Sequence, residues 1–184
     1  MLRAGNVLVP LLGFAALPAA GEAQNPAERG SQMIITSTVF TEGGNIPIQY
    51  TCDGADRSPP LAWSSVPQAA KTLALIHDDP DAPGKTWVHW VVINIPPGMS
   101  GFEEAIASDS LARQGVVEGT TDFGRRGYGG PCPPSGTHRY YFKLYALDTA
   151  LDLGPEATKK QVESAMEGHI LEQAQLMGRY TRRR

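Results

Sequence analysis

Five side chains that could bind a ligand or exchange a proton lie where apolar runs of the sequence begin or end. They are Asp79, Asp81, His89, His138 and Tyr140. The two aspartates close one run, His89 lies near the start of the next, and the last pair begins a third. Because successive side chains of a strand point to opposite faces, each run would carry a polar group on the same face as apolar residues. Three such strands side by side would form an apolar wall with a polar mouth, which is the shape of a small-ligand pocket.

The types of these side chains favour the binding of an anion. Carboxylates beside imidazoles favour the protonated, cationic histidine and fix its orientation. Two histidinium groups, a tyrosine hydroxyl and the amides of a glycine-rich loop would then hold a phosphate or a carboxylate. Bare aspartates would repel that anion. We therefore expect the aspartates to hold the histidines and the loop, or to receive an ammonium or hydroxyl group of the ligand.

Each polar residue taken alone also has a structural explanation. Asp81 could cap a turn, and Tyr140 could be a core aromatic whose hydroxyl is satisfied locally. We expect His77 to be a core histidine that is hydrogen-bonded to a carbonyl group, and His169 to be a packing or surface residue. The argument for a site is therefore the convergence of three separate runs.

Two other chemistries fit the sequence less well. A metal site with His89, His138 and Asp79 as ligands is an alternative, but no spacing in the chain is diagnostic of one. Nucleophilic catalysis has less support, because the serines lie in no nucleophile elbow. A phosphate-cradling P-loop is absent as well.

The elements that would position these residues are mainly strands. Twenty glycines and fifteen prolines favour many short strands and turns. Residues 73–79 and 87–95 flank a loop rich in proline and predict a central hairpin in which Asp79 and His89 come close together. Further strands are expected at 33–40, 46–50, 61–63 and 138–147. In the second arm of the hairpin, one face should carry Trp87, His89, Val91, Ile93 and Ile95.

A helix is expected near the end of the chain. Thr158 and Gln161 fit a capping box, and Gly178 could end the helix. The residues that recur at helical spacing are Val162, Ala165, Met166, His169, Ile170, Gln173 and Met177. A weaker pattern allows a short helix within 102–115. The loop at 120–136 is rich in glycine and proline, and a loop of this length is usually functional or disordered. Its aromatic residues favour order.

Composition and the N-terminal segment suggest an exported single-domain protein. The chain has 184 residues and a formal charge of −3, which gives no electrostatic footprint for nucleic acid. An apolar stretch at 7–20, followed by small residues before Gln24, predicts a secretory signal rather than a membrane span of ~20 residues. An uncleaved anchor is the alternative. We expect a signal at 1–23, a flexible leader at 24–32, one domain at 33–178 and a basic tail at 179–184. No transmembrane span is expected in the mature chain, which would be periplasmic or secreted.

The two cysteines, Cys52 and Cys132, allow three interpretations. An even pair in an exported chain is compatible with one disulfide. Two free, buried thiols are the alternative. A metal site has less support, since neither cysteine belongs to a paired motif.

Four blocks of the sequence resemble the phosphatidylethanolamine-binding protein family, and more narrowly its bacterial and archaeal Raf kinase inhibitor-like branch. The blocks are YTCDGADRSPPLAW at 50–63, DPDAP at 79–83, WVHWVVINIP at 87–96 and TDFGRRGYGGPCPPSGTHRYYFKLYALD at 121–148. The resemblance implies a mainly β fold of the antiparallel β-sandwich type, with short peripheral helices and a C-terminal helix.

The resemblance also implies a ligand-binding pocket. Its residues would be Asp79, Asp81, Ala82, Pro83, His89, Gly130, Pro131, Pro134, His138 and Tyr140. Cys132 and Pro133 depart from the shorter eukaryotic pattern of the glycine-proline lip. The C-terminal helix that helps to close the pocket in eukaryotic members has no match in the present tail.

We therefore expect an exported, non-enzymatic binding protein for a phosphorylated or carboxylated small ligand resembling a phospholipid head group, with no cofactor. Members of the family that the chain resembles bind such anions, and some inhibit proteases or regulate kinases. A protein-binding inhibitor that uses the glycine-proline lip is the first alternative. A metal-dependent hydrolase is the second.

Overall fold

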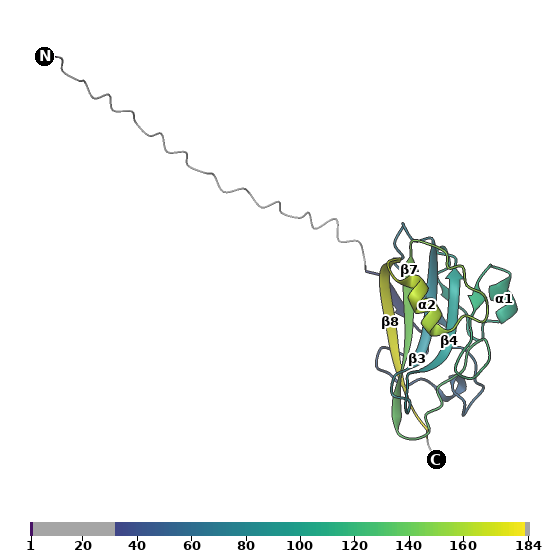
Figure 1. The fold of residues 1–184 in the computed structure, drawn as a ribbon. Coiled ribbons are helices and arrows are strands. Elements are labelled where there is room, and N and C mark those ends of the chain that lie inside the picture. The colour runs from purple at the N-terminus through teal and green to yellow at the C-terminus, as the bar shows by residue number, and fades with distance from the viewer. Residues whose placement is uncertain (2–31, 183–184) are drawn as a thin grey trace. The chain divides into compact units, whose positions relative to one another are not determined.

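Among the described residues, the chain forms two antiparallel sheets, two short helices and one 3-10 turn (Figure 1). The structure is a computed structural model that describes Met1 and residues 32–182. The first sheet has the strand order β1-β2-β5, and the second has the order β6-β4-β3-β7-β8. The expected β-sandwich-type fold is confirmed. The predicted signal and nearly all of the leader lie outside the described residues.

The elements have the following bounds. The first sheet contains β1 (Ile34–Thr36), β2 (Leu61–Ser64) and β5 (Gly101–Phe102). The second contains β6 (Val117–Glu118), β4 (Trp87–Ile95), β3 (Thr72–Asp79), β7 (Thr137–Leu147) and β8 (Ile170–Thr181). The helical elements are the 3-10 helix η2 (Ile48–Tyr50), α1 (Ser108–Ala112) and α2 (Lys159–Met166). The segment 46–50 is thus not the strand that the sequence suggested, because Pro47 leads into the 3-10 turn.

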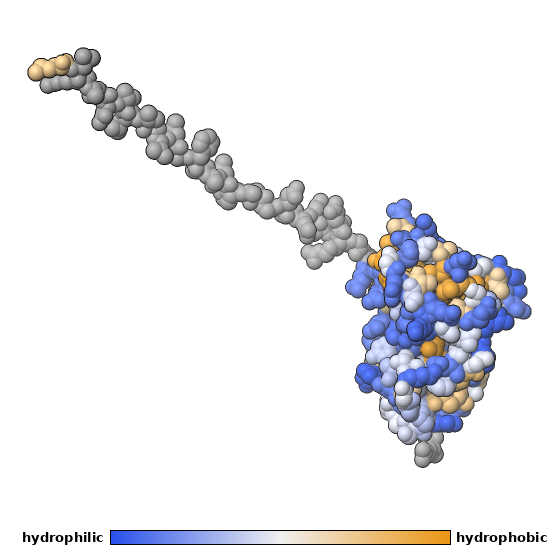
Figure 2. Space-filling view, in the orientation of Figure 1, coloured by the Kyte–Doolittle hydropathy of each residue, from blue (hydrophilic) through white to orange (hydrophobic). Residues whose placement is uncertain are grey.

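Strand β3 is buried along its whole length because both of its faces are covered. Leu73 and Leu75 pack into a core between the two sheets. Ala74 and Ile76 pack into a second core with Val162 of α2, which lies across the other face of the large sheet (Figure 1). The exposed face in Figure 2 is mostly hydrophilic, with hydrophobic residues confined to small patches. Among the described residues, no helix is long and apolar enough to cross a membrane.

The central hairpin forms, but its second arm does not keep a regular alternation. His77 pairs with Trp90 and Asp78 pairs with Val88, so His89 is the extra residue of a bulge. A second irregularity precedes Ile95. As a result Val91 and Ile93 pack under α2, away from His89, and the face predicted for them was wrong. A bulge changes which face follows it, and alternation in the sequence does not reveal it.

The predicted C-terminal helix is confirmed only in its first two turns. The capping box of Thr158 and Gln161 is present, and the helix ends at Met166. Gly168 has a φ of +79°, which leaves the helical region, and the chain continues as β8. Residues expected to be helical, among them His169, Ile170, Gln173 and Met177, therefore precede or lie in that strand.

The long edge of β7 explains this outcome, since it offers eleven paired positions to β8. Pairing satisfies the backbone groups of both strands, and tertiary context overrides weak helical propensity. Gly178 does not end a helix; it lies within β8, where a Cβ atom would come within 2.4 Å of Ile46. Strand β8 runs on to Thr181, so Arg179 of the basic run is part of the sheet.

A buried ion cluster ties α2 to the sheet. Asp78 of β3 is fully buried, and its Oδ2 accepts hydrogen bonds from Lys143 Nζ at 2.8 Å and Lys159 Nζ at 2.6 Å. Burial is the largest single influence on Lys159 and lowers its pKa, but the hydrogen bond to Asp78 and the charges of Asp78 and Glu163 together outweigh it and raise the pKa of the lysine. Helix α2 is therefore held by charge as well as by apolar packing.

We expect Asp78→Ala to lower the free energy of unfolding by about 2 to 3 kcal/mol, because removing one member of a buried ion cluster leaves its partners uncompensated. The value lies below the full cost of a buried charge because both lysines reach solvent. Urea denaturation measures the effect. Lys160→Ala on the exposed side of α2 is the control, and equal stability of the two variants would contradict the assignment.

Candidate functional site

The site is a cavity of about 290 Å³ at the end of the central hairpin. Its lining residues are Asp79, Ala82, Pro83, Trp87, His89, Phe123, Cys132 and Pro134. They come from the end of β3, the turn that follows, the start of β4, and the loop at 120–136. Most of the wall is therefore apolar, and two buried polar side chains, Asp79 and His89, enter it.

The structure brings the sequence-predicted residues to one region, where some line the cavity and others lie behind its wall. Lining the cavity itself are Asp79, Ala82, Pro83, His89 and Pro134. The others, Asp81, Gly130, Pro131, His138 and Tyr140, are absent from the cavity wall and contact residues that form it or support it. His138 Nδ1 lies 2.7 Å from Asp79 Oδ2, and the Tyr140 ring lies edge-on to His89 at 5.3 Å.

His89 is held with a defined ring orientation. Its Nδ1–H donates to the carbonyl oxygen of Gly129 at 2.8 Å, so Nε2 is the nitrogen left for a ligand. Burial lowers the pKa of His89, and this effect exceeds the opposing influence of the Gly129 carbonyl and of Asp79. The sequence argument expected the neighbouring carboxylates to favour a cationic imidazole. For His89 that expectation was wrong, because desolvation of the ring is the larger effect.

The two aspartates are both engaged within the protein. Asp79 Oδ1 accepts from the Asp81 N–H at 2.8 Å, and its Oδ2 pairs with His138. Asp81 receives the Arg139 guanidinium at 2.9 and 2.7 Å and the Arg139 N–H at 2.9 Å. These hydrogen bonds lower the pKa of Asp81 to about 2. Asp81 therefore stabilises the rim through Arg139, and Asp79 is the carboxylate that faces the cavity.

Tyr140 and the two remaining histidines differ in their surroundings. The Tyr140 hydroxyl is buried and has no hydrogen-bond partner among the described residues. Burial, followed by the charge of Asp79, raises its pKa, so the hydroxyl keeps its proton. His77 is the expected core histidine, with Nδ1 3.1 Å from the Tyr141 carbonyl oxygen. His169 is exposed and pairs with Asp148 at 2.8 Å.

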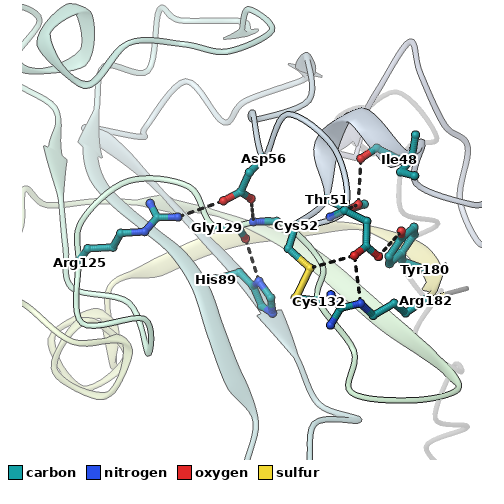
Figure 3. Close-up of a disulfide and its surroundings, with 12 residues drawn as sticks. Ile48, Thr51, Cys52, Asp56, His89, Arg125, Gly129, Cys132, Tyr180 and Arg182 are labelled. Carbon is teal, nitrogen blue, oxygen red and sulfur yellow. Dashed lines mark hydrogen bonds and ion pairs between the residues drawn. A yellow bond between two sulfur atoms is a disulfide. The ribbon is translucent and has the colours of Figure 1, made fainter. Parts of the chain in front are cut away.

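The two cysteines form a disulfide, with their Cα atoms 5.4 Å apart (Figure 3). Cys132 lines the cavity, so the bond fixes one side of the pocket. Of the three interpretations that the sequence allowed for Cys52 and Cys132, the disulfide is confirmed.

Three residues at the site were not predicted from the sequence to belong to it. Trp87 and Phe123 line the cavity with ring centroids 5.6 Å apart, and Arg139 holds Asp81 at the rim. Trp87 directly follows the turn and shares a strand with His89, and Phe123 is an aromatic residue in a glycine-rich loop. An aromatic residue at either of these positions could have indicated a pocket wall from the sequence.

The metal-site alternative is not supported by the arrangement of the side chains. Within residues 32–182, no three His, Cys, Asp or Glu side chains are placed to hold a metal ion. His89 turns Nδ1 to Gly129, while His138 and Asp79 bond each other. The expected ligand set is therefore not assembled.

Comparison with known proteins gives consistent matches over the described domain. The family model of the phosphatidylethanolamine-binding protein matches residues 36–181. A UPF0098 protein of Methanothermobacter thermautotrophicus is 55% identical over 150 residues, covering 82% of this chain and 99% of its own. A UPF0098 protein of Aquifex aeolicus is 47% identical over 156 residues, covering 83% and 91%.

Two solved structures are similar in fold. A phosphatidylethanolamine-binding protein homologue from Chlamydia trachomatis matches with a TM-score of 0.77 at 42% identity, covering 83% of this chain and 99% of the other. YbcL of E. coli, described as a member of the mammalian PEBP family, matches with a TM-score of 0.77 at 30% identity, covering 83% and 100%.

Replacing both Cys52 and Cys132 by serine should lower the free energy of unfolding by up to about 4 kcal/mol, as expected for a loop of this length. The sequence separation closed by the bond is 80 residues. Urea denaturation of the oxidised protein, of the reduced protein and of the double variant measures the effect. Reduction alone should reproduce the loss, and an unchanged midpoint in both would contradict the prediction.

Proposed function

The chain belongs to the phosphatidylethanolamine-binding protein family, and we propose that it is an exported, non-enzymatic binding protein for a small phosphorylated or carboxylated ligand such as a phospholipid head group. The observation that supports this proposal most is the small cavity with two buried polar side chains, Asp79 and His89, in an otherwise apolar wall. Small-ligand sites have this composition, with few polar groups that set orientation. Its volume of about 290 Å³ suits a head group rather than a whole lipid.

Export is supported by the sequence before the domain and by the disulfide. The apolar stretch at 7–20 is followed by the small residues Gly21 and Ala23, a pattern typical of a cleaved signal. A structural disulfide such as Cys52–Cys132 persists in oxidising compartments.

The state of His89 sets how the pocket would hold an anion. A neutral ring with Nδ1–H on Gly129 offers Nε2 as an acceptor, so it receives a proton from an acidic ligand or takes one from solvent. The protonated ring then forms a charge-assisted hydrogen bond with a phosphate or carboxylate oxygen. Asp79 is the obstacle, because it is an anion on the same wall. Its two oxygens already accept hydrogen bonds from Asp81 and His138, which reduces the repulsion.

We expect inorganic phosphate and phosphoethanolamine to shift the NMR signals of the His89 and His138 side chains. His89→Ala should weaken binding by about 10- to 100-fold, since a hydrogen bond to a charged group contributes ~1.5–3 kcal/mol. Isothermal titration calorimetry measures the affinity. His169→Ala is the control, because the His169 side chain is exposed and its ring pairs with Asp148, away from the cavity.

Unchanged NMR signals of both the His89 and the His138 side chains during the titration would contradict the proposal. The first alternative, a protein-binding inhibitor, is favoured by one feature: Phe123 is 39% exposed in a loop that the disulfide helps to hold. An inhibitor of this kind would keep protease inhibition in His89→Ala, whereas the pocket proposal predicts no such activity.

Binding should take up a proton, and the affinity should fall as the pH rises. Burial places the pKa of free His89 below its usual value of ~6.5, and a bound anion raises it. The affinity is then constant below the pKa of the free protein and falls through the window up to the pKa of the complex. Sulfate is the test ligand, since it does not itself titrate in this range. Calorimetry from pH 5 to pH 8 in two buffers of different ionisation enthalpy measures the uptake, and an affinity independent of pH would contradict it.

A further inference from the structure

A loop about 80 residues earlier in the sequence holds one wall of the pocket in place. Residues 128–132, which include the start of the glycine-proline lip, are called the lip from here on. Residues 50–56 are called the clamp loop. The Tyr128 hydroxyl donates to the Tyr50 carbonyl at 2.8 Å, and the Cys52 N–H donates to the Pro131 carbonyl at 3.2 Å. The disulfide adds a covalent link (Figure 3). The lip has no regular secondary structure, so these links determine where its backbone lies.

One residue of the lip is paired with the pocket histidine through both of its backbone groups. The Gly129 N–H donates to the His89 carbonyl at 3.0 Å, and the Gly129 carbonyl accepts from His89 Nδ1–H at 2.8 Å. A Cβ atom on Gly129 would come within 2.4 Å of the Phe123 ring. The backbone of the lip therefore approaches the hairpin directly, without a side chain between them.

The next peptide group connects His89 to the clamp loop. The peptide between Gly129 and Gly130 has its carbonyl on His89 Nδ1 and its N–H on Asp56 Oδ1, at 2.6 Å (Figure 3). A carboxylate, one peptide group and an imidazole thus form a single chain of hydrogen bonds. Such chains are cooperative, because a charged acceptor at the N–H polarises the peptide and makes its carbonyl a stronger acceptor.

Asp56 is itself fixed at both oxygens. Its Oδ2 pairs with Arg125 Nη2 at 3.3 Å, and Arg125 Nη1 donates to the Tyr128 carbonyl at 2.8 Å. A Cβ atom on Gly130 would meet the Tyr50 carbonyl at 2.5 Å and Asp56 Oδ1 at 2.7 Å, so only glycine allows this approach. Asp56 adopts a φ of 51°, in the left-handed region that Asn, Asp and Gly tolerate best.

We propose that Asp56 is a positioning residue for the pocket, which acts through the Gly129–Gly130 peptide to keep the proton of His89 on Nδ1 and to present Nε2 to the ligand. The effect on the ligand rests on the proposed function, whereas the effect on the histidine tautomer does not. Removing the carboxylate weakens the Gly129 carbonyl as an acceptor, so the tautomer with the proton on Nε2 gains population. The ring that binds an anion is doubly protonated, with Nδ1–H donating to the Gly129 carbonyl and Nε2–H donating to the ligand. A weaker acceptor at Gly129 therefore also disfavours this cationic ring and lowers the affinity for the anion.

The test uses two substitutions of Asp56 that keep its backbone conformation. Asp56→Gly removes the side chain and permits the positive φ, while Asp56→Asn keeps an acceptor oxygen without the charge. Asp53→Asn is the matched control, because Asp53 lies in the same loop and bonds Tyr180 and Arg182 rather than the lip. The ¹⁵N chemical shifts of the His89 ring in the ligand-free full chain report the tautomer, and calorimetry with inorganic phosphate and with sulfate reports binding.

In the native protein and in Asp53→Asn, Nδ1 should carry the proton. Asp56→Gly should shift both ring nitrogens toward tautomer exchange and weaken phosphate binding about tenfold, a size typical of residues that orient a ligating histidine. In Asp56→Asn, both the change in the ring shifts and the loss of phosphate affinity should be smaller than in Asp56→Gly, because Asn keeps an acceptor oxygen. A tautomer in Asp56→Gly equal to the native one overturns the proposal, even if urea denaturation shows a loss of stability, since a purely structural role would give that result.

The two proposals fail in different ways. A tautomer shift in Asp56→Gly, in a protein that binds neither phosphate nor sulfate, would support the positioning role and contradict the anion pocket. Native His89 shifts in Asp56→Gly, in a protein that binds phosphate and sulfate, would contradict the positioning role and support the anion pocket. If Asp56→Gly does not fold, Asp56→Asn decides alone, because its lost charge should still move the His89 shifts away from those of Asp53→Asn.

Discussion

The burial of three consecutive polar side chains in strand β3 is the constraint on which the structure depends. His77, Asp78 and Asp79 are at most 3% exposed, and buried polar groups are costly unless they are hydrogen-bonded. Since alternate side chains face opposite sides, the three cannot share a partner. His77 bonds the Tyr141 carbonyl, Asp78 bonds two lysines under α2, and Asp79 bonds His138. The strand that organises both cores therefore also places a carboxylate at the pocket.

The pocket wall is made rigid by links between loops rather than by strands. Residues 128–132 carry no regular secondary structure, yet they bond the clamp loop through the disulfide, through Tyr128 and through Gly130. A site needs its groups held within a fraction of an ångström, and a loop achieves this only when packing and hydrogen bonds support it. Here the support comes from a segment about 80 residues earlier in the sequence.

The charge state of the site follows from burial more than from neighbouring charges. His89 lies beside Asp79, which favours the imidazolium, but desolvation lowers its pKa. At neutral pH the cavity therefore presents an acceptor nitrogen and a carboxylate whose oxygens are occupied. The proposed anion would be accommodated together with a proton, and the protonation of His89 would then be part of its recognition.

The family, the mainly β class, the central hairpin and the capping box of α2 could all be predicted from the order of the residues, because they depend on local patterns and on short blocks such as DPDAP. The sequence also indicated that Asp79, His89 and His138 converge. The bulge at His89 and the conversion of 170–181 into a strand became visible only in the folded chain, since both depend on pairing with a partner strand. The disulfide, the pKa of His89 and the link from Asp56 through Gly129 and Gly130 likewise depend on distances between remote segments. Residue order alone does not specify such distances, and they set the chemistry of the pocket.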